Sequence, residues 1–221
     1  MENKKFDIVV MDPPWEYKGG FVFTKTSSAR NHYDVDWAKK FNNLPLTDIV
    51  KDDSLLFMWT TAPKLSEGIS LMEELGWTYK TIAFVWEKVR VNPGYYTLSS
   101  TEYVLVGKRG KIPGGKGGVP VRNIRQFLQE KRSKKHSEKP EEIQNRIETM
   151  FDPNKFNLLE LFARRQRPNW VCAGNELDGL DIFDWVDKWS KDEIVDNDNQ
   201  YQRVHREQES VEESLDNSNG M

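Results

Sequence analysis

The chain has 221 residues, enough for one domain with a sizeable hydrophobic core. Its single cysteine, Cys172, excludes an intramolecular disulfide, which suits a reducing compartment. No apolar run approaches the roughly 20 residues needed to span a bilayer, and the first residues show no cleavable leader pattern. From these features we expect a soluble cytoplasmic protein that does not enter a membrane.

The charge is distributed unevenly along the chain. The net charge is −3, yet residues 191–221 hold nine acidic and three basic residues, which leaves residues 1–190 at +3. A segment so acidic and so poor in apolar residues cannot offset its ordering entropy by burial. We therefore expect one folded domain over residues 1–190 and a disordered acidic tail over residues 191–221.

Short apolar runs alternate with helical patterns along the chain. Strands are expected over residues 6–11, 55–59, 81–86, 102–106, 158–162 and 170–173. A helix is expected to open at Pro63 and to end at Gly76, and another from Pro140 to Met150, while Thr47 is expected to cap a short helix. Residues 107–139 show no core pattern. The alternation predicts an open α/β sheet with functional residues at the carboxyl ends of its strands.

The tetrapeptide Asp12-Pro13-Pro14-Trp15 directly follows the first expected strand. Adenine's exocyclic amino group is a poor nucleophile because its lone pair is delocalised, so a site that methylates it needs acceptors for both amino hydrogens. The Asp12 carboxylate and the Pro13 carbonyl are two such acceptors, and the locked φ angles of the prolines fix the direction of that carbonyl. Trp15 offers a ring on which an extruded base can stack. The same residues also suit a plain turn, so the tetrapeptide alone leaves that alternative open.

Asp-Pro-Pro-Trp is the catalytic motif of a family of N6-adenine methyltransferases. That family includes the catalytic subunit of the eukaryotic mRNA methyladenosine writer and DNA methyltransferases of bacteria and phages. The chain resembles this family over about residues 6–180, because further segments match it in the same order: His32-Tyr33, Phe57–Thr60, Gly76-Trp77, Phe84–Lys88, Gly94–Tyr96, Glu102–Gly107, His136–Pro140, Glu160–Arg164 and Gly174–Glu176.

The resemblance implies a Rossmann-like sheet that binds S-adenosyl-L-methionine. In this family the catalytic strand precedes the cofactor strand, a circular permutation of the usual methyltransferase order. Catalytic roles are implied for Asp12, Pro13, Pro14 and Trp15. Cofactor-binding roles are implied for Asp12, Lys139, Glu160, Phe162, Arg164, Asn175 and Glu176. The segment after Arg164 is shorter than in the mRNA enzyme and lacks its His-Asn pair, which puts cofactor contacts from that loop in doubt.

Substrate contacts are expected from a basic stretch and from the loop after the tetrapeptide. Residues 107–146 hold twelve basic and four acidic residues, and such residues supply phosphate contacts that weaken with salt. Within residues 107–139 we read a Gly-rich, substrate-binding insertion with a hinge at residues 114–118, although a solvated loop is the alternative. The expected substrate-binding residues are Tyr17, His32, Tyr33, Lys108, Arg109, Lys116, Arg122 and Arg125.

The expected reaction is in-line transfer of a methyl group from sulfur to the adenine nitrogen, with no metal required because the sulfonium brings its own leaving group. DNA is favoured over RNA as the substrate because the chain is compact. The alternatives are an RNA enzyme, a glutamine-amide methyltransferase and a catalytically silent nucleic-acid-binding subunit. The resemblance also implies assembly as a homodimer or with a related subunit, and the sequence does not decide between these.

Overall fold

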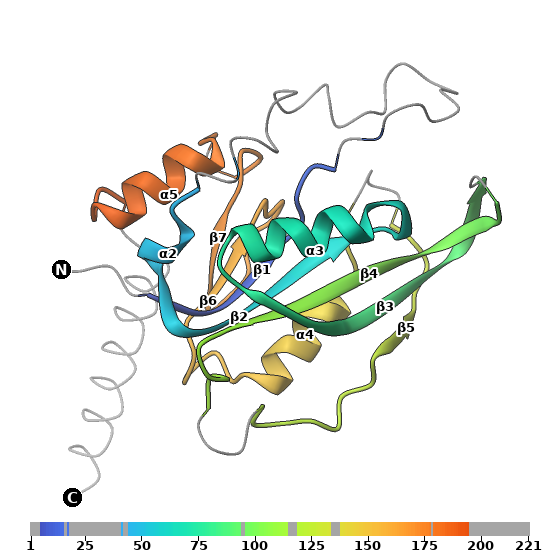
Figure 1. Ribbon diagram of the computed structural model, residues 1–221, viewed down its shortest axis with the longest axis horizontal. Coiled ribbons are helices and arrows are strands. Elements are labelled where there is room, and N and C mark those ends of the chain that lie inside the picture. Colours follow the sequence, from blue (N-terminus) through green and yellow to red (C-terminus); the bar gives the residue numbers. More distant parts are fainter. Residues whose placement is uncertain are drawn as a thin grey trace, which may run out of the picture.

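A computed structural model describes residues 5–15, 17, 41, 44–93, 96–114, 119–133, 138–177 and 179–194. Its core is one seven-stranded sheet with helices on both faces (Figure 1). The strands are β1 (Phe6–Met11), β2 (Val50–Thr60), β3 (Thr78–Pro93), β4 (Leu98–Arg109), β5 (Phe127–Gln129), β6 (Leu158–Leu161) and β7 (Trp170–Ala173). The helices are α2 (Leu46–Ile49), the 3-10 turn η2 (Ala62–Lys64), α3 (Leu65–Glu74), α4 (Glu141–Met150) and α5 (Ile182–Ser190).

The strand order in the sheet is β5-β3-β4-β2-β1-β6-β7. Strand β1 pairs in parallel with β2 and β6, and β6 pairs in parallel with β7. On the other side β4 runs antiparallel to both β2 and β3, and β5 adds a short parallel edge to β3. The carboxyl ends of β1, β2 and β6 therefore meet at one edge of the sheet, which is where open α/β sheets bind ligands.

Strand β1 is buried along its whole length because both faces of the sheet are covered. Successive side chains point to opposite faces, so Val9 and Met11 pack in one apolar cluster with α3 and α5. Ile8 and Val10 pack in a second cluster, which contains the buried face of α4. A continuous apolar run, rather than an alternating one, is the pattern of such a two-sided strand.

Helix α3 ends at a glycine, as its sequence predicts. Gly76 has a φ of +95°, and its amide donates to the carbonyl of Glu73, while the Trp77 amide donates to the carbonyl of Met72. These two bonds form a Schellman motif, which satisfies carbonyls at the end of the helix. The turn leads the chain straight into β3 and places the fully buried Trp77 beneath the helix.

The sheet confirms the expected α/β class, but several elements are longer than expected or were not expected. The six expected strands are all present; β2 and β3 are longer than predicted. Residues 107–139 were expected to lack core elements, yet they contain β5, whose Leu128 is buried against α4. Pro140 is the N-cap of α4 rather than its first residue, and Thr47 lies inside α2 rather than capping it. Helix α5 was not predicted.

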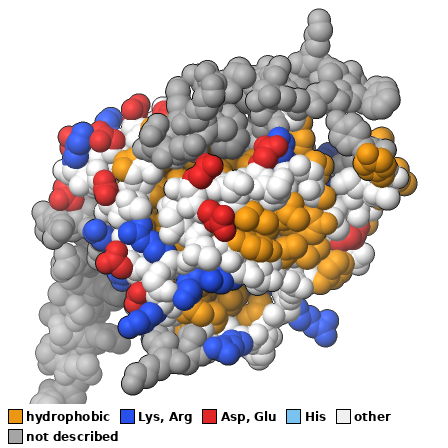
Figure 2. Space-filling view, in the orientation of Figure 1, with side chains coloured by type: hydrophobic (Ala, Val, Ile, Leu, Met, Phe, Trp, Pro, Cys, Tyr) orange, Lys and Arg blue, Asp and Glu red, His pale blue; other side chains and the backbone are white. Residues whose placement is uncertain are grey.

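Strands β3 and β4 form a long hairpin that projects from the sheet (Figure 1). Its described outer part exposes apolar side chains, among them Val89, Val91, Leu98 and a fully exposed Tyr96. Figure 2 shows hydrophobic side chains gathered on the visible face of the sheet and at the projecting end of the hairpin. Within the described part of the chain, no helix has the length and apolar character needed to cross a membrane. Beyond Ile194 the expected acidic tail lies outside the described residues.

Candidate active site

Asp12 leaves the sheet at the carboxyl end of β1 and begins the Asp-Pro-Pro-Trp turn. The Trp15 amide donates to the Pro13 carbonyl over 2.9 Å, which closes a tight turn. The Trp15 indole Nε1 donates to the carbonyl of Trp59, at the end of β2, over 2.9 Å. Locked proline φ angles and these two bonds hold the turn rigid, so the Asp12 carboxylate has a fixed position at the edge of the sheet.

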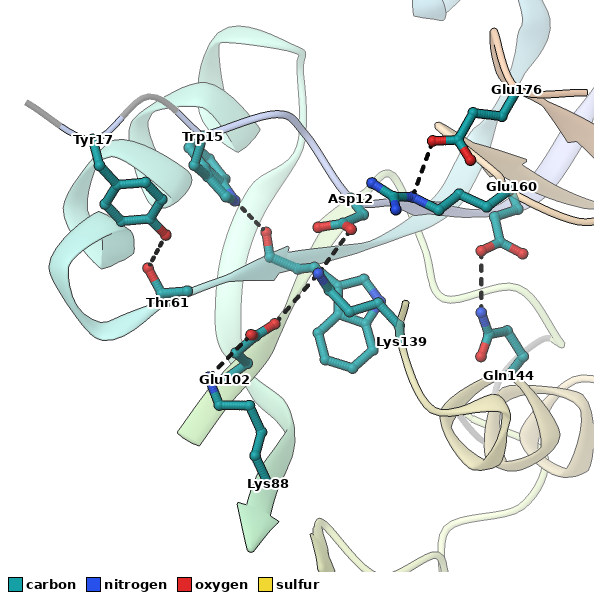
Figure 3. A network of polar contacts seen from close by, with 12 residues as sticks. Asp12, Trp15, Tyr17, Thr61, Lys88, Glu102, Lys139, Gln144, Glu160 and Glu176 are labelled. Carbon is teal, nitrogen blue, oxygen red and sulfur yellow. Dashed lines mark hydrogen bonds and ion pairs between the residues drawn. The ribbon is translucent and has the colours of Figure 1, made fainter. Parts of the chain in front are cut away.

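A chain of alternating charges extends from Asp12 across the edge of the sheet (Figure 3). Lys139 Nζ lies 2.8 Å from Asp12 Oδ2 and 3.3 Å from Glu102 Oε2. Lys88 Nζ lies 3.2 Å from the other oxygen, Oε1, of Glu102. All four side chains are largely shielded from solvent, so the pairs are screened much less than surface ion pairs. The arrangement holds Lys139 between two carboxylates, one of which is that of Asp12 in the Asp-Pro-Pro-Trp turn.

Burial and pairing shift the pKa values of these groups in different directions. Burial raises the pKa of Asp12 above its usual value even though the Lys139 ammonium opposes the rise. Burial would raise the pKa of Glu102 as well, but the ammonium groups of Lys139 and Lys88 bring it below its usual value. Burial alone would lower the pKa of Lys139, and the carboxylates of Asp12 and Glu102 instead raise it. Lys139 therefore stays protonated, and the Asp12 carboxylate beside it is more basic than an ordinary aspartate.

Aromatic side chains close one side of this edge. Trp15 is only 8% exposed, so its ring is packed into the fold rather than standing free for a base to stack on. Lys139 Nζ lies 5.5 Å from the centre of the Trp59 ring, a cation–π distance. The exposed Tyr17 hydroxyl makes a 2.6 Å hydrogen bond with Thr61 Oγ1, directly after β2. Tyr17 thus lies beside the turn, and its contact with substrate stays a prediction.

A cleft with about 370 Å³ of empty space, part of which is open solvent, lies beside Asp12. Burial raises the pKa of Glu160, on β6, although a hydrogen bond from Gln144 opposes the rise. Gln144 Nε2 makes that bond over 3.1 Å, and its Oε1 is buried without a partner. The lining residues are Asp12, Glu138, Lys139, Gln144, Glu160, Phe162, Arg164 and Arg165.

The chain after β6 is strained where it borders the cleft. Phe162 has a φ of +63°, a left-handed conformation that is unfavourable for an aromatic residue and that is found preferentially at functional sites. Arg164 Nε lies 3.6 Å from Glu176 Oε1, so the loops after β6 and β7 meet there. Gly174 precedes Asn175 and Glu176, and a Cβ on it would lie 2.2 Å from the Ala163 carbonyl oxygen. Only glycine allows that approach.

Most of the residues expected to bind the cofactor lie together around the cleft. The residues expected to bind the substrate are more widely spread. Lys108 pairs with Leu55 on β2 and Arg109 with Ser54, whereas the turn follows the opposite end of β1. A strand advances about 3.3 Å per residue, so both side chains lie well away from Asp12, and their expected contacts with substrate phosphates stay a prediction. Arg122 and Arg125 lie on the segment that leads into β5. His32, Tyr33 and Lys116 lie outside the described residues.

Several residues of the site were given no role from the sequence, among them Glu102, Lys88 and Gln144. Glu102 and Lys88 lie in matching segments; Glu102 pairs with Trp86 across β4 and β3, and Lys88 lies two residues further along β3. Gln144 stands on the buried face of α4 among Ile143 and Ile147; a glutamine at an apolar helical position was the signal for it. Among the described residues, no cluster of three or more His, Cys, Asp or Glu side chains is arranged to hold a metal ion.

Comparisons with known proteins show similarity over most of the chain. The chain is 41% identical over 192 residues to the type II methyltransferase M.MunI of a Mycoplasma species, and the alignment covers 80% of each chain. It is 28% identical over 191 residues to the N(6)-adenosine-methyltransferase catalytic subunit METTL3 of Homo sapiens. That alignment covers 81% of this chain and 30% of the human one, so the chain spans less than a third of that relative. The MT-A70 family model matches residues 6–176, which confirms the resemblance, and the chain belongs to the MT-A70 family.

Proposed function

We propose that this protein transfers a methyl group from S-adenosyl-L-methionine to the N6 amino group of adenine in DNA. The observation that carries the proposal is the Asp12 carboxylate, fixed at the carboxyl end of β1 and bordering a partly open cleft. Membership of the MT-A70 family supports methyl transfer. The similarity to a type II methyltransferase, matched over 80% of its length, supports DNA rather than RNA as the substrate.

The cleft suits the cofactor because it combines opposite charges with a buried hydrogen-bond acceptor that has no partner within the protein. Glu176, with Asn175 and Arg164, would hold the ribose, since a carboxylate accepts hydrogen bonds from both ribose hydroxyls. Lys139 and Glu160 would hold the charged methionine end, and Phe162 would pack against the cofactor. When bound, S-adenosyl-L-methionine supplies a methyl group on a sulfonium that carries its own leaving group.

The rigid turn would act on the adenine amino group. The Asp12 carboxylate and the Pro13 carbonyl accept its two hydrogens, and this favours a tetrahedral nitrogen whose lone pair faces the cleft. The Pro13 oxygen already accepts a bond from the Trp15 amide, and its second lone pair remains for the substrate. The raised pKa of Asp12 strengthens the carboxylate as an acceptor. Most of the acceleration of methyl transfer would come from the fixed positions of the Asp12 carboxylate and the Pro13 carbonyl.

The buried Trp15 is proposed to support the turn rather than to stack on the extruded base. Its indole bond to the Trp59 carbonyl ties the turn to the end of β2. Tyr17, with His32 and Tyr33 of the following loop, is proposed to hold the base. Because β1 with Asp12 precedes β6 with Glu160 in the chain, the element order supports the circular permutation. Assembly as a homodimer or with a related subunit also remains a proposal.

The proposal is tested by incubating the purified protein with S-adenosyl-L-methionine carrying a labelled methyl group and with duplex DNA, single-stranded DNA or RNA. Digested products are resolved by mass spectrometry. Labelled N6-methyladenine in a DNA pool is the expected result. Labelled N6-methyladenosine in RNA alone would replace DNA by RNA as the substrate, and labelled methylglutamine in accompanying protein would refute adenine methylation.

A further inference from the structure

Gln144 has an unusual environment for a helix residue. It stands on the buried face of α4 and is only 3% exposed. Its amide nitrogen, Nε2, donates to Glu160 Oε1 over 3.1 Å. Its carbonyl oxygen, Oε1, is buried and accepts no hydrogen bond. Buried polar atoms are nearly always paired, so an unpaired acceptor calls for a specific explanation.

The unpaired oxygen belongs to a residue that lines the cleft beside Asp12. Cations of the protein next to it are engaged elsewhere: Lys139 binds Asp12 and Glu102, and Arg165 binds Glu138 and Glu141. The oxygen is itself buried, so among the described residues it is an acceptor without a protein donor, on a side chain that also lines the cleft. In Figure 3 Gln144 lies beside Glu160, on the side of the network away from Glu176.

The acceptors that border this part of the cleft match a particular donor. The carboxylates of Asp12 and Glu160 and the Gln144 carbonyl oxygen are three acceptors on three different elements. A primary ammonium group has three N–H donors and no acceptor. Such an ammonium group would donate a hydrogen bond to the Gln144 oxygen. It would also place a positive charge next to the Glu160 carboxyl, whose hydrogen-bond partner in the structure is the neutral Gln144 amide.

We propose that Gln144 Oε1 accepts a hydrogen bond from the α-ammonium group of the bound cofactor's methionine moiety. This inference rests on the proposed function, which places the ribose near Glu176 and hence the methionine end toward Lys139. Gln144 is then a cofactor-binding residue, and it also orients Glu160 through its amide nitrogen. A nearby ammonium would favour the ionised form of Glu160, whose pKa burial now raises.

The test compares the wild type with Gln144→Met, which keeps an unbranched side chain of similar length but has no carbonyl acceptor. Two ligands are titrated by competition calorimetry: S-adenosylhomocysteine, and its analogue in which hydrogen replaces the α-amino group. We expect Gln144→Met to weaken S-adenosylhomocysteine binding about tenfold, the size of one hydrogen bond to a charged donor. Binding of the deaminated analogue should change by less than about twofold.

A role through Glu160 alone is separated by repeating the comparison in a Glu160→Gln background. A direct bond predicts that Gln144→Met still weakens S-adenosylhomocysteine binding there, whereas disappearance of the effect would overturn the direct contact. Equal losses for both ligands would assign Gln144 a purely structural role and also overturn the inference. Unchanged binding by Gln144→Met, with tight wild-type binding, would refute this inference alone. Failure of the wild type to bind either ligand would refute the proposed function with it.

Discussion

The ammonium group of Lys139 lies 2.8 Å from the Asp12 carboxylate and 3.3 Å from that of Glu102. Lys139 immediately precedes Pro140, the N-cap of α4, whereas Asp12 follows β1 and Glu102 lies on β4. One side chain thus ties a helix start to two strands of the sheet. The pKa of Asp12 depends on this contact, because the Lys139 ammonium opposes the rise that burial causes.

The first prediction concerns the pH dependence of methyl transfer. Transfer needs Asp12 ionised, and its pKa is raised by burial against the opposing effect of Lys139. The rate should therefore fall as the pH drops through this raised pKa. Lys139→Gln removes the opposing charge, so the acid limb of the kcat profile should move to higher pH. Superimposable acid limbs in the two proteins would show that Asp12 ionisation does not control the rate.

The second prediction concerns the buried Lys88–Glu102 pair. Glu102→Gln leaves the Lys88 ammonium, which is buried, without its carboxylate. Removing one partner of such a pair should lower the free energy of unfolding by about 3–5 kcal/mol. Urea denaturation of the double variant Lys88→Met/Glu102→Gln, which removes both charges, should show recovery of most of this loss. A double variant no more stable than the single one would contradict the pairing.

The contribution of Glu102 to the free energy of unfolding should also depend on pH. Its pKa is lowered in the folded protein by Lys139 and Lys88, so its contribution to stability is present above the pKa of the unfolded chain. That contribution is lost as the pH falls through the lower folded pKa. The unfolding free energies of wild type and Glu102→Gln should accordingly converge in acid. A constant difference between pH 7 and acid would indicate that packing rather than charge accounts for the effect.

The third prediction concerns Gly174. A Cβ at this position would lie 2.2 Å from the Ala163 carbonyl oxygen, a backbone atom that cannot rotate away. Gly174→Ala should destabilise the fold by about 1–3 kcal/mol and weaken cofactor binding by displacing Asn175 and Glu176. Gly68→Ala is the control, because its Cβ meets side-chain atoms at 3.2 Å or more and alanine favours the helix. Similar losses in both variants, measured by urea unfolding, would argue against a special role for Gly174.

The fourth prediction concerns DNA binding by the basic stretch. Lys131 and Arg132 are exposed and follow β5 at its carboxyl end, where Glu130 bonds to the backbone of Glu87 beside the site. Replacing both by glutamine should reduce the slope of log affinity against log salt by about 1.8, as expected for two lost phosphate contacts.

The matched control for this experiment is Lys108→Gln/Lys111→Gln, which removes the same charge from the far end of β4. Its salt slope should stay close to that of the wild type. Equal slopes for the two double variants would mean that DNA is attracted by overall charge and not by a surface next to the cleft.

The central strands were predictable from sequence because their environment leaves a simple pattern. Strand β1 and the second half of β2 are buried on both faces and therefore read as unbroken apolar runs. The end of α3 was predictable because Gly76 adopts a left-handed conformation. In contrast, β5 has three residues, and only Leu128 among them is buried. The strand forms because it pairs with β3, and the local sequence pattern does not predict that pairing.

Two other features were not predicted. The expected strands over residues 81–86 and 102–106 leave about 15 residues between them, enough for a parallel crossover, whereas the observed strands are longer and only residues 94–97 separate β3 from β4. Helix α5 has an aspartate N-cap at Asp181 and buries Trp185 and Trp189 one turn apart, a regular helical signal. The hydrophobic surface that α5 covers was not apparent without the sheet.

The site was predictable as a set of motifs but not as a network. Asp12 and Lys139 were named from the resemblance, yet their contact depends on how α4 meets β1. The pairing of Lys88 with Glu102 needs the register of β3 against β4, which hydrophobic patterns do not specify to one residue. Lys108 is expected to contact substrate because it belongs to a basic run; the strand direction places it well away from Asp12, which the run of charges alone does not reveal, and its contact with substrate stays a prediction.

The account's central claim is that the Asp12 carboxylate holds the adenine amino group. The most direct test is the single-turnover rate of N6-methyladenine formation by Asp12→Asn, with cofactor and DNA affinities measured on the same preparation. We predict a fall of about 10²–10³-fold in rate at saturating cofactor and DNA, because an amide presents a donor where the amino hydrogens need an acceptor. A rate within a few fold of the wild type, with both ligands bound, would contradict the claim.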